Sequence, residues 1–299
     1  MDRPLEAVLL MAYGAARTLD EIPAYLADIR GGRPAPPELV GEVRRRYELM
    51  GGGSPLFSIT DSQAAALAKA TGGRVAVGMR HSEPTILSVV RRLADEGCRR
   101  VVGLPLTPFQ SSLSVGAYFK KLDEAAAAAG VEAVRTGDWH AHPSLVAAYA
   151  ARVAEAAARV PPGLRARTEL LLTAHSLPQR ILTEGDPYPA QLAETAGLVA
   201  RAAGFAAHRF AYQSRGATDV AWLGPDACEV LKDIAAAGAK AVVLCPVGFV
   251  SEHMETRYDN DVLHRAQAEG LGLRFERAAA LNDHPLFIAA LAAAARSRP

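Results

Sequence analysis

The chain has 299 residues, of which 50% are hydrophobic and 22% are charged, and its formal net charge is +1. This length suits two domains, and this composition is typical of a globular protein with a large core. A net charge so close to zero excludes a global field that would attract nucleic acid. Any anion-binding site must therefore be built from local basic residues.

Short apolar runs alternate with helical patterns along the chain. The runs are rich in branched residues, as buried parallel strands are, and they cover residues 7–14, 75–79, 99–106, 168–175, 208–213, 240–249 and 273–278. The helical stretches between them cover residues 38–50, 60–71, 84–97, 143–159, 188–203 and 226–237. This alternation predicts an α/β fold with parallel sheets and helices on both sheet faces.

The two halves of the chain resemble each other. A strand ends in MAYG in the first half and in TAHS in the second, and a later strand in each half runs into a proline and an aromatic residue. We therefore expect two similar doubly wound, Rossmann-like domains that face a central cleft, with ligands beyond the carboxyl ends of the strands. The predicted boundaries are 1–140, 141–283 and, for a last helix that packs back on the first domain, 284–299.

Neither a targeting segment nor a membrane span is predicted. The first six residues are charged and lead straight into a short apolar run, without the pattern of a secretory signal. The apolar stretches 241–250 and 286–295 are well short of the roughly 20 residues that cross a bilayer. A cytoplasmic protein is therefore expected.

The three cysteines, Cys98, Cys228 and Cys245, are far apart and form no CxxC pair. They are too few to supply the four thiolates of an iron–sulfur cluster, so no such cluster is expected. Cys245 lies within VVLCPVG and is predicted to be a buried core thiol.

Two segments of the second half carry candidate catalytic residues. His175 ends the apolar run in LLLTAHSLP, where an imidazole can accept a proton or bind a metal, although a capping or core histidine has the same pattern. SEHMETRYDND is typical of the first turns of a helix, with Ser251 as its N-cap and Glu252, Glu255 and Asp259 on one face. Such acids can pass a divalent cation or accept protons, or can simply complement the helix dipole.

The first half carries groups suited to a carboxylate ligand. Tyr13 ends the first strand and is followed by Gly14, which allows a flat ligand to approach the backbone. The basic and hydroxyl-bearing residues that follow are Arg30, Arg44, Arg45, Arg46, Tyr47, Ser54 and Tyr118. Arginine binds carboxylates through two parallel hydrogen bonds, so this set suits a flat polycarboxylate, whereas a solvated helix face is the alternative for Arg44 and Arg45. The GGGSPL loop does not match a nucleotide-binding pattern.

Several segments resemble the ferrochelatase family, in the family's order: LLLTAHSLP, GDPYPAQL, YQS, WLGPD and PVGFVSEHMETRYDND. The segments MAYG, IRGGRP and RRRYELMGGGSPL resemble the branch of the family that uses coproporphyrin. The resemblance runs from about residue 5 to the last helix. It implies a lyase of haem biosynthesis that inserts Fe²⁺ into coproporphyrin III and releases two protons.

The resemblance also implies roles for single residues. His175 and Glu255 would bind Fe²⁺ and accept the protons, and Tyr13 would be the axial ligand of the product iron. The substrate propionates would be bound by Arg30, Arg46, Tyr47, Ser54 and Tyr118. The acidic line of the family often continues one turn beyond Asp259, where this chain has Leu263, so an outer metal site that uses Arg46, Asp259 and a further acid is left open.

Other functions stay open at this point. A protoporphyrin IX ferrochelatase would share most of these motifs. A cobalt or nickel chelatase usually carries a second histidine where this chain has Glu255. A non-catalytic haem or porphyrin carrier would need Tyr13 or His175 but no proton acceptor. We expect no cofactor beyond the substrate Fe²⁺, a monomer, and transient contacts with neighbouring haem-pathway enzymes.

Overall fold

The computed structural model describes residues 6–216 and 220–297, and the chain divides into two compact units. Unit 1 comprises 1–108, 112–139 and 288–299, and unit 2 comprises 109–111 and 140–287. Residues 1–5, which belong to the stretch predicted to lack a targeting signal, lie outside the described residues. No helix within the described ranges combines the length and the hydropathy needed to cross a membrane.

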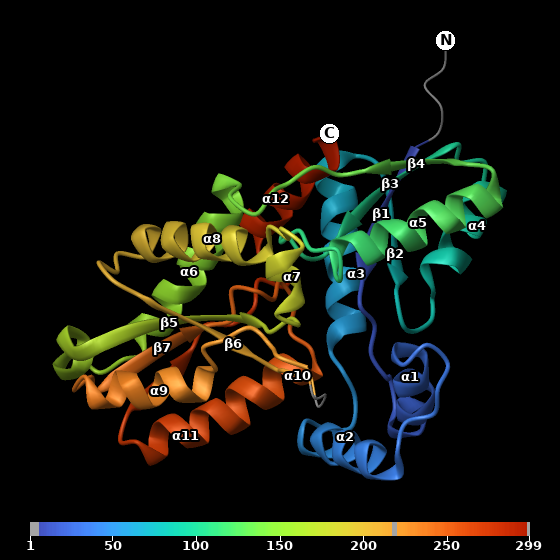
Figure 1. Cartoon of the computed structure of the whole chain (residues 1–299). Coiled ribbons are helices and arrows are strands. Elements are labelled where there is room, and N and C mark those ends of the chain that lie inside the picture. The colour runs from blue at the N-terminus through green and yellow to red at the C-terminus, as the bar shows by residue number, and fades with distance from the viewer. Residues whose placement is uncertain (1–5, 217–219, 298–299) are drawn as a thin grey trace. The chain divides into compact units, whose positions relative to one another are not determined.

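Unit 1 is built on a parallel sheet with the strand order β2-β1-β3-β4 (Figure 1). Its strands are β1 (Glu6–Ala12), β2 (Arg74–Met79), β3 (Arg100–Pro105) and β4 (Glu132–Arg135). Its helices are η1 (Leu19–Glu21), α1 (Ile22–Ile29), α2 (Pro37–Leu49), α3 (Leu56–Thr71), α4 (Ile86–Asp95) and α5 (Val115–Ala129). Leu9 and Met11 of β1 pack with Leu122 of α5, whereas Ala12 packs with Phe57 of α3. Because successive side chains of a strand point to opposite faces of the sheet, β1 contributes to the core on both of its faces.

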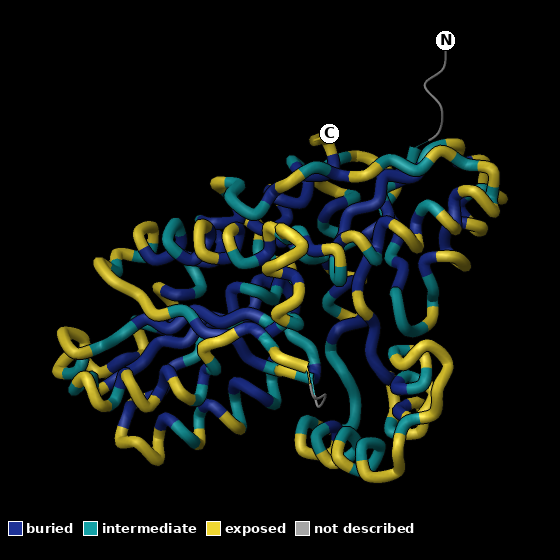
Figure 2. Tube along the Cα trace, in the orientation of Figure 1, coloured by how far each residue is buried: buried dark blue, intermediate teal, exposed yellow. Residues whose placement is uncertain are grey.

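Unit 2 repeats this plan with the strand order β6-β5-β7-β8 (Figure 1). Its strands are β5 (Thr168–His175), β6 (Arg209–Gln213), β7 (Ala241–Cys245) and β8 (Arg274–Arg277). Its helices are α6 (Pro143–Ala158), η2 (Pro162–Arg167), α7 (Arg180–Thr183), α8 (Tyr188–Ala202), α9 (Ala227–Ala236), α10 (Met254–Arg257), η3 (Tyr258–His264) and α11 (Arg265–Gly270). Helices α6 and α8 cover one face of the sheet, and α9 and α11 cover the other. Figure 2 shows the strands buried between these layers.

The predicted fold class is confirmed, since both sheets are parallel and flanked by helices. The predicted strand 240–249 is wrong beyond Cys245, because proline has no N–H for the ladder and the N–H of Val247 turns back to the Cys245 carbonyl (2.8 Å). Strand β4 was missed because it is a short, partly exposed edge strand. The last helix, α12 (Pro285–Arg296), passes from unit 2 to unit 1 after Phe287. The predicted domain boundaries and the cleft stay predictions.

One glycine brings the segment after β7 against β5. The N–H of Gly248 donates a hydrogen bond to the carbonyl of Thr173 (3.0 Å), and a Cβ on Gly248 would lie 2.5 Å from the Cβ and 2.7 Å from the Cα of Ala174. No side chain fits in that space, so glycine is required for this backbone contact. The contact is made directly beside the end of β5, where His175 lies.

We predict that Gly248→Ala lowers the free energy of unfolding by about 1–3 kcal/mol, because the added methyl group overpacks a rigid strand. Urea denaturation of the two proteins measures the difference. The matched control is Gly270→Ala in α11, where nothing lies within 4 Å of the added Cβ. That change should leave the free energy of unfolding the same as in the parent or raise it by up to about 1 kcal/mol. Equal stability of Gly248→Ala and the parent would contradict the packing argument.

Candidate active site

His175 is held by its backbone and by one ring nitrogen. The Tyr188 hydroxyl donates to the His175 carbonyl (2.9 Å), and the N–H of Ser176 donates to the Gln213 carbonyl (2.8 Å). The imidazole Nδ1 contacts the carbonyl oxygen of Ser176. A proton on Nδ1 satisfies that carbonyl, which leaves the Nε2 lone pair available for a metal or a proton.

Glu255 lies in the first turn of α10, and a histidine caps this helix. The His253 N–H donates to Thr256 Oγ1 (3.0 Å), and the Thr256 N–H points back to His253 Nδ1 (3.5 Å). The prediction that Ser251 is the N-cap is therefore wrong, because the extended backbone continues through His253. The reciprocal contacts satisfy donors that a helix start leaves unpaired, and they set the direction of the turn that carries Glu255.

His175 and Glu255 form a pair within unit 2. Nε2 of His175 lies 3.6 Å from Oε1 of Glu255, and both side chains are partly exposed. Burial alone would lower the pKa of His175 and raise the pKa of Glu255. Burial is the largest single influence on each pKa, but the opposite charge of the partner and the hydrogen bonds together outweigh it, so the pKa of His175 is raised and the pKa of Glu255 is well below its usual value. Each group thus favours the charged form of the other.

The spacing of the pair would also allow both groups to contact one metal ion. With metal–ligand bonds of about 2.0–2.2 Å, two donor atoms 3.6 Å apart can both reach one ion. One imidazole and one carboxylate suit a borderline divalent cation. Within residues 6–216 and 220–297, no group of three or more His, Cys, Asp and Glu side chains is placed to hold a metal. An ion bound by this pair would therefore keep open coordination positions.

Ser214, the last residue of the YQS motif but not one of the predicted site residues, connects the two acids beside His175. Its hydroxyl donates to Asp259 Oδ2 and also lies within hydrogen-bonding reach of Glu255. The Gln213 amide donates to the same hydroxyl oxygen (3.3 Å). Ser214 follows β6 directly and has a left-handed backbone with φ of 60°. A polar residue at a strand's carboxyl end is the signal that could have identified it.

The acids of SEHMETRYDND do not form the predicted row. Glu252 precedes α10, and its carboxylate binds Arg277 (2.6 Å) instead of sharing a face with Glu255. The helix after α10 is a π-helix, η3, in which the turn holds more residues than an α-helix, so the predicted i, i+3, i+7 spacing does not apply. Asp259 is buried in η3 and acts electrostatically on His175. The structure therefore brings Glu255 and Asp259 to the site and removes Glu252 from it.

In unit 1, Tyr13 lies in an aromatic and basic cluster. Its ring centroid is 4.6 Å from that of His81, and the guanidinium of Arg80 lies 5.8 Å from the ring centroids of both Tyr13 and Tyr118. His81 is fixed by Asp28, with 2.7 Å between Nδ1 and Oδ2. Tyr13 is 42% exposed, so its phenol can meet a ligand, whereas Tyr118 is buried and supports the cluster from below.

The remaining predicted residues of unit 1 lie on or near α1 and α2. Arg30 is exposed at the C-terminal end of α1, and Arg46 forms an ion pair with Glu42 on α2. Tyr47 is buried, and its hydroxyl accepts a hydrogen bond from the N–H of Ala16 (3.2 Å). Tyr47 therefore supports the loop that follows β1. Ser54 accepts a hydrogen bond from the N–H of Leu56 (3.3 Å) at the start of α3.

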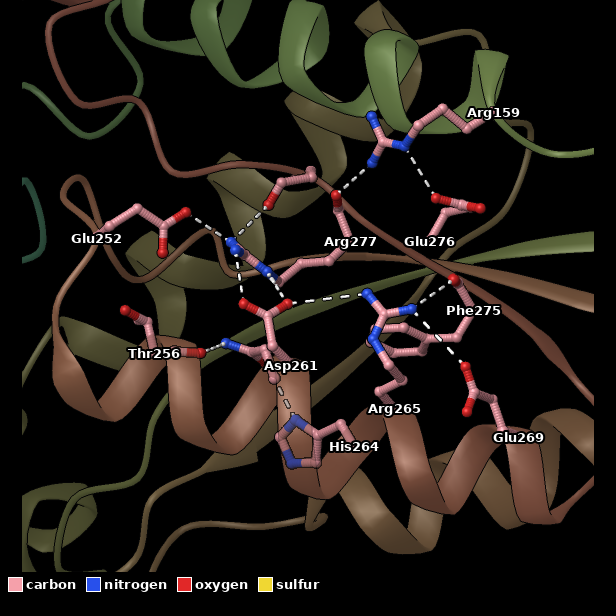
Figure 3. A network of polar contacts seen from close by, with 12 residues as sticks. Arg159, Glu252, Thr256, Asp261, His264, Arg265, Glu269, Phe275, Glu276 and Arg277 are labelled. Carbon is pink, nitrogen blue, oxygen red and sulfur yellow. Dashed lines mark hydrogen bonds and ion pairs between the residues drawn. The ribbon is translucent and has the colours of Figure 1, made fainter. Parts of the chain in front are cut away.

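The end of η3 is apolar on its exposed side and polar inside. Leu263, at the position where the family often has a further acid, is 44% exposed. His264 is buried, and its Nδ1 lies 3.0 Å from the side-chain oxygen of Asn260, whose amide donates to the Thr256 carbonyl (2.8 Å; Figure 3). His264 is therefore part of the internal structure of the helix.

The overall fold is that of tetrapyrrole chelatases. SirB, a sirohydrochlorin chelatase from Bacillus subtilis subspecies spizizenii solved in complex with cobalt, matches with a TM-score of 0.59 at 11% identity, over 98% of this chain and 94% of that chain. CbiX, the terminal enzyme for biosynthesis of sirohaem in denitrifying bacteria, matches with a TM-score of 0.55 at 15% identity, over 97% of each chain. At these identities the matches establish the fold alone.

The particular family follows from sequence. The ferrochelatase family model matches residues 5–298. A ferrochelatase from Deinococcus radiodurans is 40% identical over 97% of this chain and 94% of its own length. A ferrochelatase from Herpetosiphon aurantiacus is 39% identical over 94% of this chain and 95% of its own length. The coproporphyrin III ferrochelatase of Geobacillus kaustophilus is 36% identical over 100% of this chain and 97% of its own. The chain belongs to the ferrochelatase family, which confirms the resemblance seen in its motifs.

His264 predicts a specific pH dependence of stability. Burial lowers its pKa to about 4, so the folded state disfavours the proton that the unfolded chain accepts near its ordinary value of about 6.5. Between these values, stability should fall as the pH falls, by about 1.4 kcal/mol per pH unit. His264→Gln has no imidazole at this position, so this part of the pH dependence of stability is absent from the variant. The stability deficit of the variant, measured by urea denaturation, should therefore shrink from pH 7.5 to pH 5. Parallel stability curves would contradict the assignment.

Proposed function

We propose that this chain inserts Fe²⁺ into coproporphyrin III and releases two protons, which gives Fe-coproporphyrin III for haem biosynthesis. The observation that carries the proposal is the pairing of His175 with Glu255 at 3.6 Å. Family membership and relatives named coproporphyrin III ferrochelatase support the choice of metal and substrate. A cytoplasmic location and a monomeric state belong to the same proposal.

The paired groups suit the chemistry of metal insertion. A free-base porphyrin must lose two N–H protons as the metal enters, so proton acceptors must lie beside the incoming ion. His175 first releases its proton to solvent and offers Nε2 to the ion, and once the ion passes into the macrocycle the freed Nε2 takes up one of the two porphyrin protons. Glu255, kept ionised by its neighbours, takes up a proton from the macrocycle, and the two groups act as one coupled acid–base pair.

The carboxylates of coproporphyrin account for the groups of unit 1 in this proposal. Arg30, Arg46 and Ser54 would bind propionates, with Tyr47 and Tyr118 supporting them, and Tyr13 would ligate the iron of the product. Hydrogen bonds between arginine and carboxylate are charge-assisted and can be bidentate, which suits a substrate with four propionates. Contacts so far from the reacting nitrogens can also be used to distort the macrocycle toward the geometry that accepts a metal.

Glu255→Gln tests the proton-accepting role. Because an amide cannot accept the proton, turnover of coproporphyrin III with Fe²⁺ under anaerobic conditions should fall by about 10²-fold or more. The loss of free-base absorbance measures it. The matched control is Glu269→Gln on α11, an exposed acid that pairs with Arg265, which should keep turnover within about twofold. Binding of Fe-coproporphyrin should survive in both variants. Full turnover by Glu255→Gln would overturn the role, and no turnover by the parent chain despite tight product binding would favour a carrier.

Arg30→Met tests the substrate. Loss of one charge-assisted contact should raise the KM for coproporphyrin III by about tenfold, and it should change the KM for protoporphyrin IX much less, because that substrate has fewer carboxylates. Arg33→Met, an exposed arginine three residues further on, is the control. If the parent chain prefers protoporphyrin IX, the proposal of a ferrochelatase is kept, but the proposal that coproporphyrin III is its substrate is wrong.

A further inference from the structure

Arg277 ends β8, the strand that lies beside β7 in the sheet of unit 2. Its register partner on β7 is Leu244, and the N–H of Ala278 donates to the Leu244 carbonyl (2.8 Å). Parallel neighbours end at the same edge of a sheet, so Arg277 lies where the chain leaves β7 on its way to α10. This position gives a β8 side chain access to the segment that carries Glu255.

The guanidinium of Arg277 binds two carboxylates at once (Figure 3). Nε and Nη2 donate to the two oxygens of Asp261 at 2.7 and 2.9 Å, and Nη1 donates to Oε1 of Glu252 at 2.6 Å. Only 13% of the Arg277 side chain and 12% of the Glu252 side chain are exposed. Charge-assisted hydrogen bonds that are bidentate and mostly shielded from solvent are among the strongest polar interactions in a protein.

The loop after β8 strengthens the hold on Glu252. Oε1 of Glu252 also accepts a hydrogen bond from the N–H of Ala280 (3.0 Å), and the N–H of Glu252 donates to the side-chain oxygen of Asn282 (2.9 Å). Glu252 is thus fixed through its backbone as well as its side chain. At the other contact, Asp261 lies in η3, one helical segment beyond α10.

The two acids held by Arg277 flank Glu255 in the chain. Glu252 comes three residues before it and Asp261 comes six residues after it, and α10 begins between Glu252 and Glu255. We infer that Arg277 is a positioning residue, which holds the chain on both sides of Glu255 and so keeps the Glu255 carboxylate beside His175. The inference rests on the proposed function, since it assigns Arg277 a role in the chemistry of that pair.

The clamp has an electrostatic consequence as well as a geometric one. Four acids, Glu252, Glu255, Asp259 and Asp261, lie within ten residues of one another. Arg277 neutralises two of them, Glu252 and Asp261, and engages their oxygens. Without the guanidinium, the poorly exposed Glu252 carboxylate would lose its cation and Asp261 would keep only the longer contact with Arg265 (3.9 Å), so repulsion between the acids would move the segment. The ion would then meet acids that compete with Glu255.

Arg277→Lys and Arg277→Met test the inference. Lysine keeps the charge but cannot bind both acids in the same fork, so an intermediate effect is expected. A small displacement of a catalytic group is costly, and we expect the kcat for Fe²⁺ insertion to fall by about tenfold in Arg277→Lys and further in Arg277→Met. The KM for coproporphyrin III should stay within about twofold. The matched control is Arg274→Met on the same strand, because the Arg274 side chain binds Glu276 (2.9 Å) and, among the described residues, none of the four acids around Glu255.

A second readout does not depend on turnover. Co²⁺ alone is titrated into each protein without porphyrin, and the visible absorption of the bound ion is followed, with His175→Ala to identify the signal of this site. Arg277→Lys should bind Co²⁺ several-fold more weakly than the parent, whereas Arg274→Met should bind it equally. Unchanged kcat and unchanged Co²⁺ affinity in Arg277→Lys, with a lower melting temperature alone, would overturn the positioning role. If the parent chain shows no iron insertion, the proposed function fails, and the Co²⁺ titration still decides the role of Arg277.

Discussion

Strands β5 and β7 lie next to each other in the sheet of unit 2, with Leu172 opposite Cys245, and the candidate site depends on this adjacency. Because parallel neighbours end at one edge, the residues that follow them meet although about eighty positions separate them in the chain. Gly248 then allows the segment after β7 to contact β5 through its backbone. His175 comes from one strand and Glu255 from the helix after the other, and their distance is set by this contact.

Around the pair, Arg277, Ser214 and His175 divide the acids of residues 252–261 among them. Glu252 and Asp261 are bound by Arg277, and Asp259 accepts a hydrogen bond from Ser214. Glu255 is left to face His175. The π-helix contributes to this division, because its wider turn shifts the direction of the side chains that follow it relative to a regular α-helix. Acids that lie close together in the sequence therefore have different roles, and the residues that they contact determine those roles.

How far the sequence could predict this arrangement depends on the kind of signal each residue carries. His175 ends an apolar strand, so a local pattern together with the strand-end rule marks it as a candidate. The pattern after β7 marks Glu252, Glu255 and Asp259 alike, and it is the family resemblance that singles out Glu255. Ser214 follows β6 in the same way, but a lone serine carries no chemical signal until Asp259 is seen beside it. Arg277 lies within an ordinary edge strand, and its role depends entirely on tertiary contacts. The π-helix and the cap at His253 arise from hydrogen bonding that no periodicity marks.

A site that offers two ligands, as we propose for His175 and Glu255, would also fit what a metal-inserting enzyme must do. A complete set of protein ligands would hold the ion and oppose its transfer, because every metal–protein bond must be broken before the four porphyrin nitrogens can bind the ion. Two ligands of mixed type bind more weakly and leave positions open to the incoming nitrogens. Such a site loses the orientation that further ligands would provide. The rigid surroundings of the pair, from the Ser176 carbonyl at the imidazole to the fixed segment that carries Glu255, supply that orientation instead.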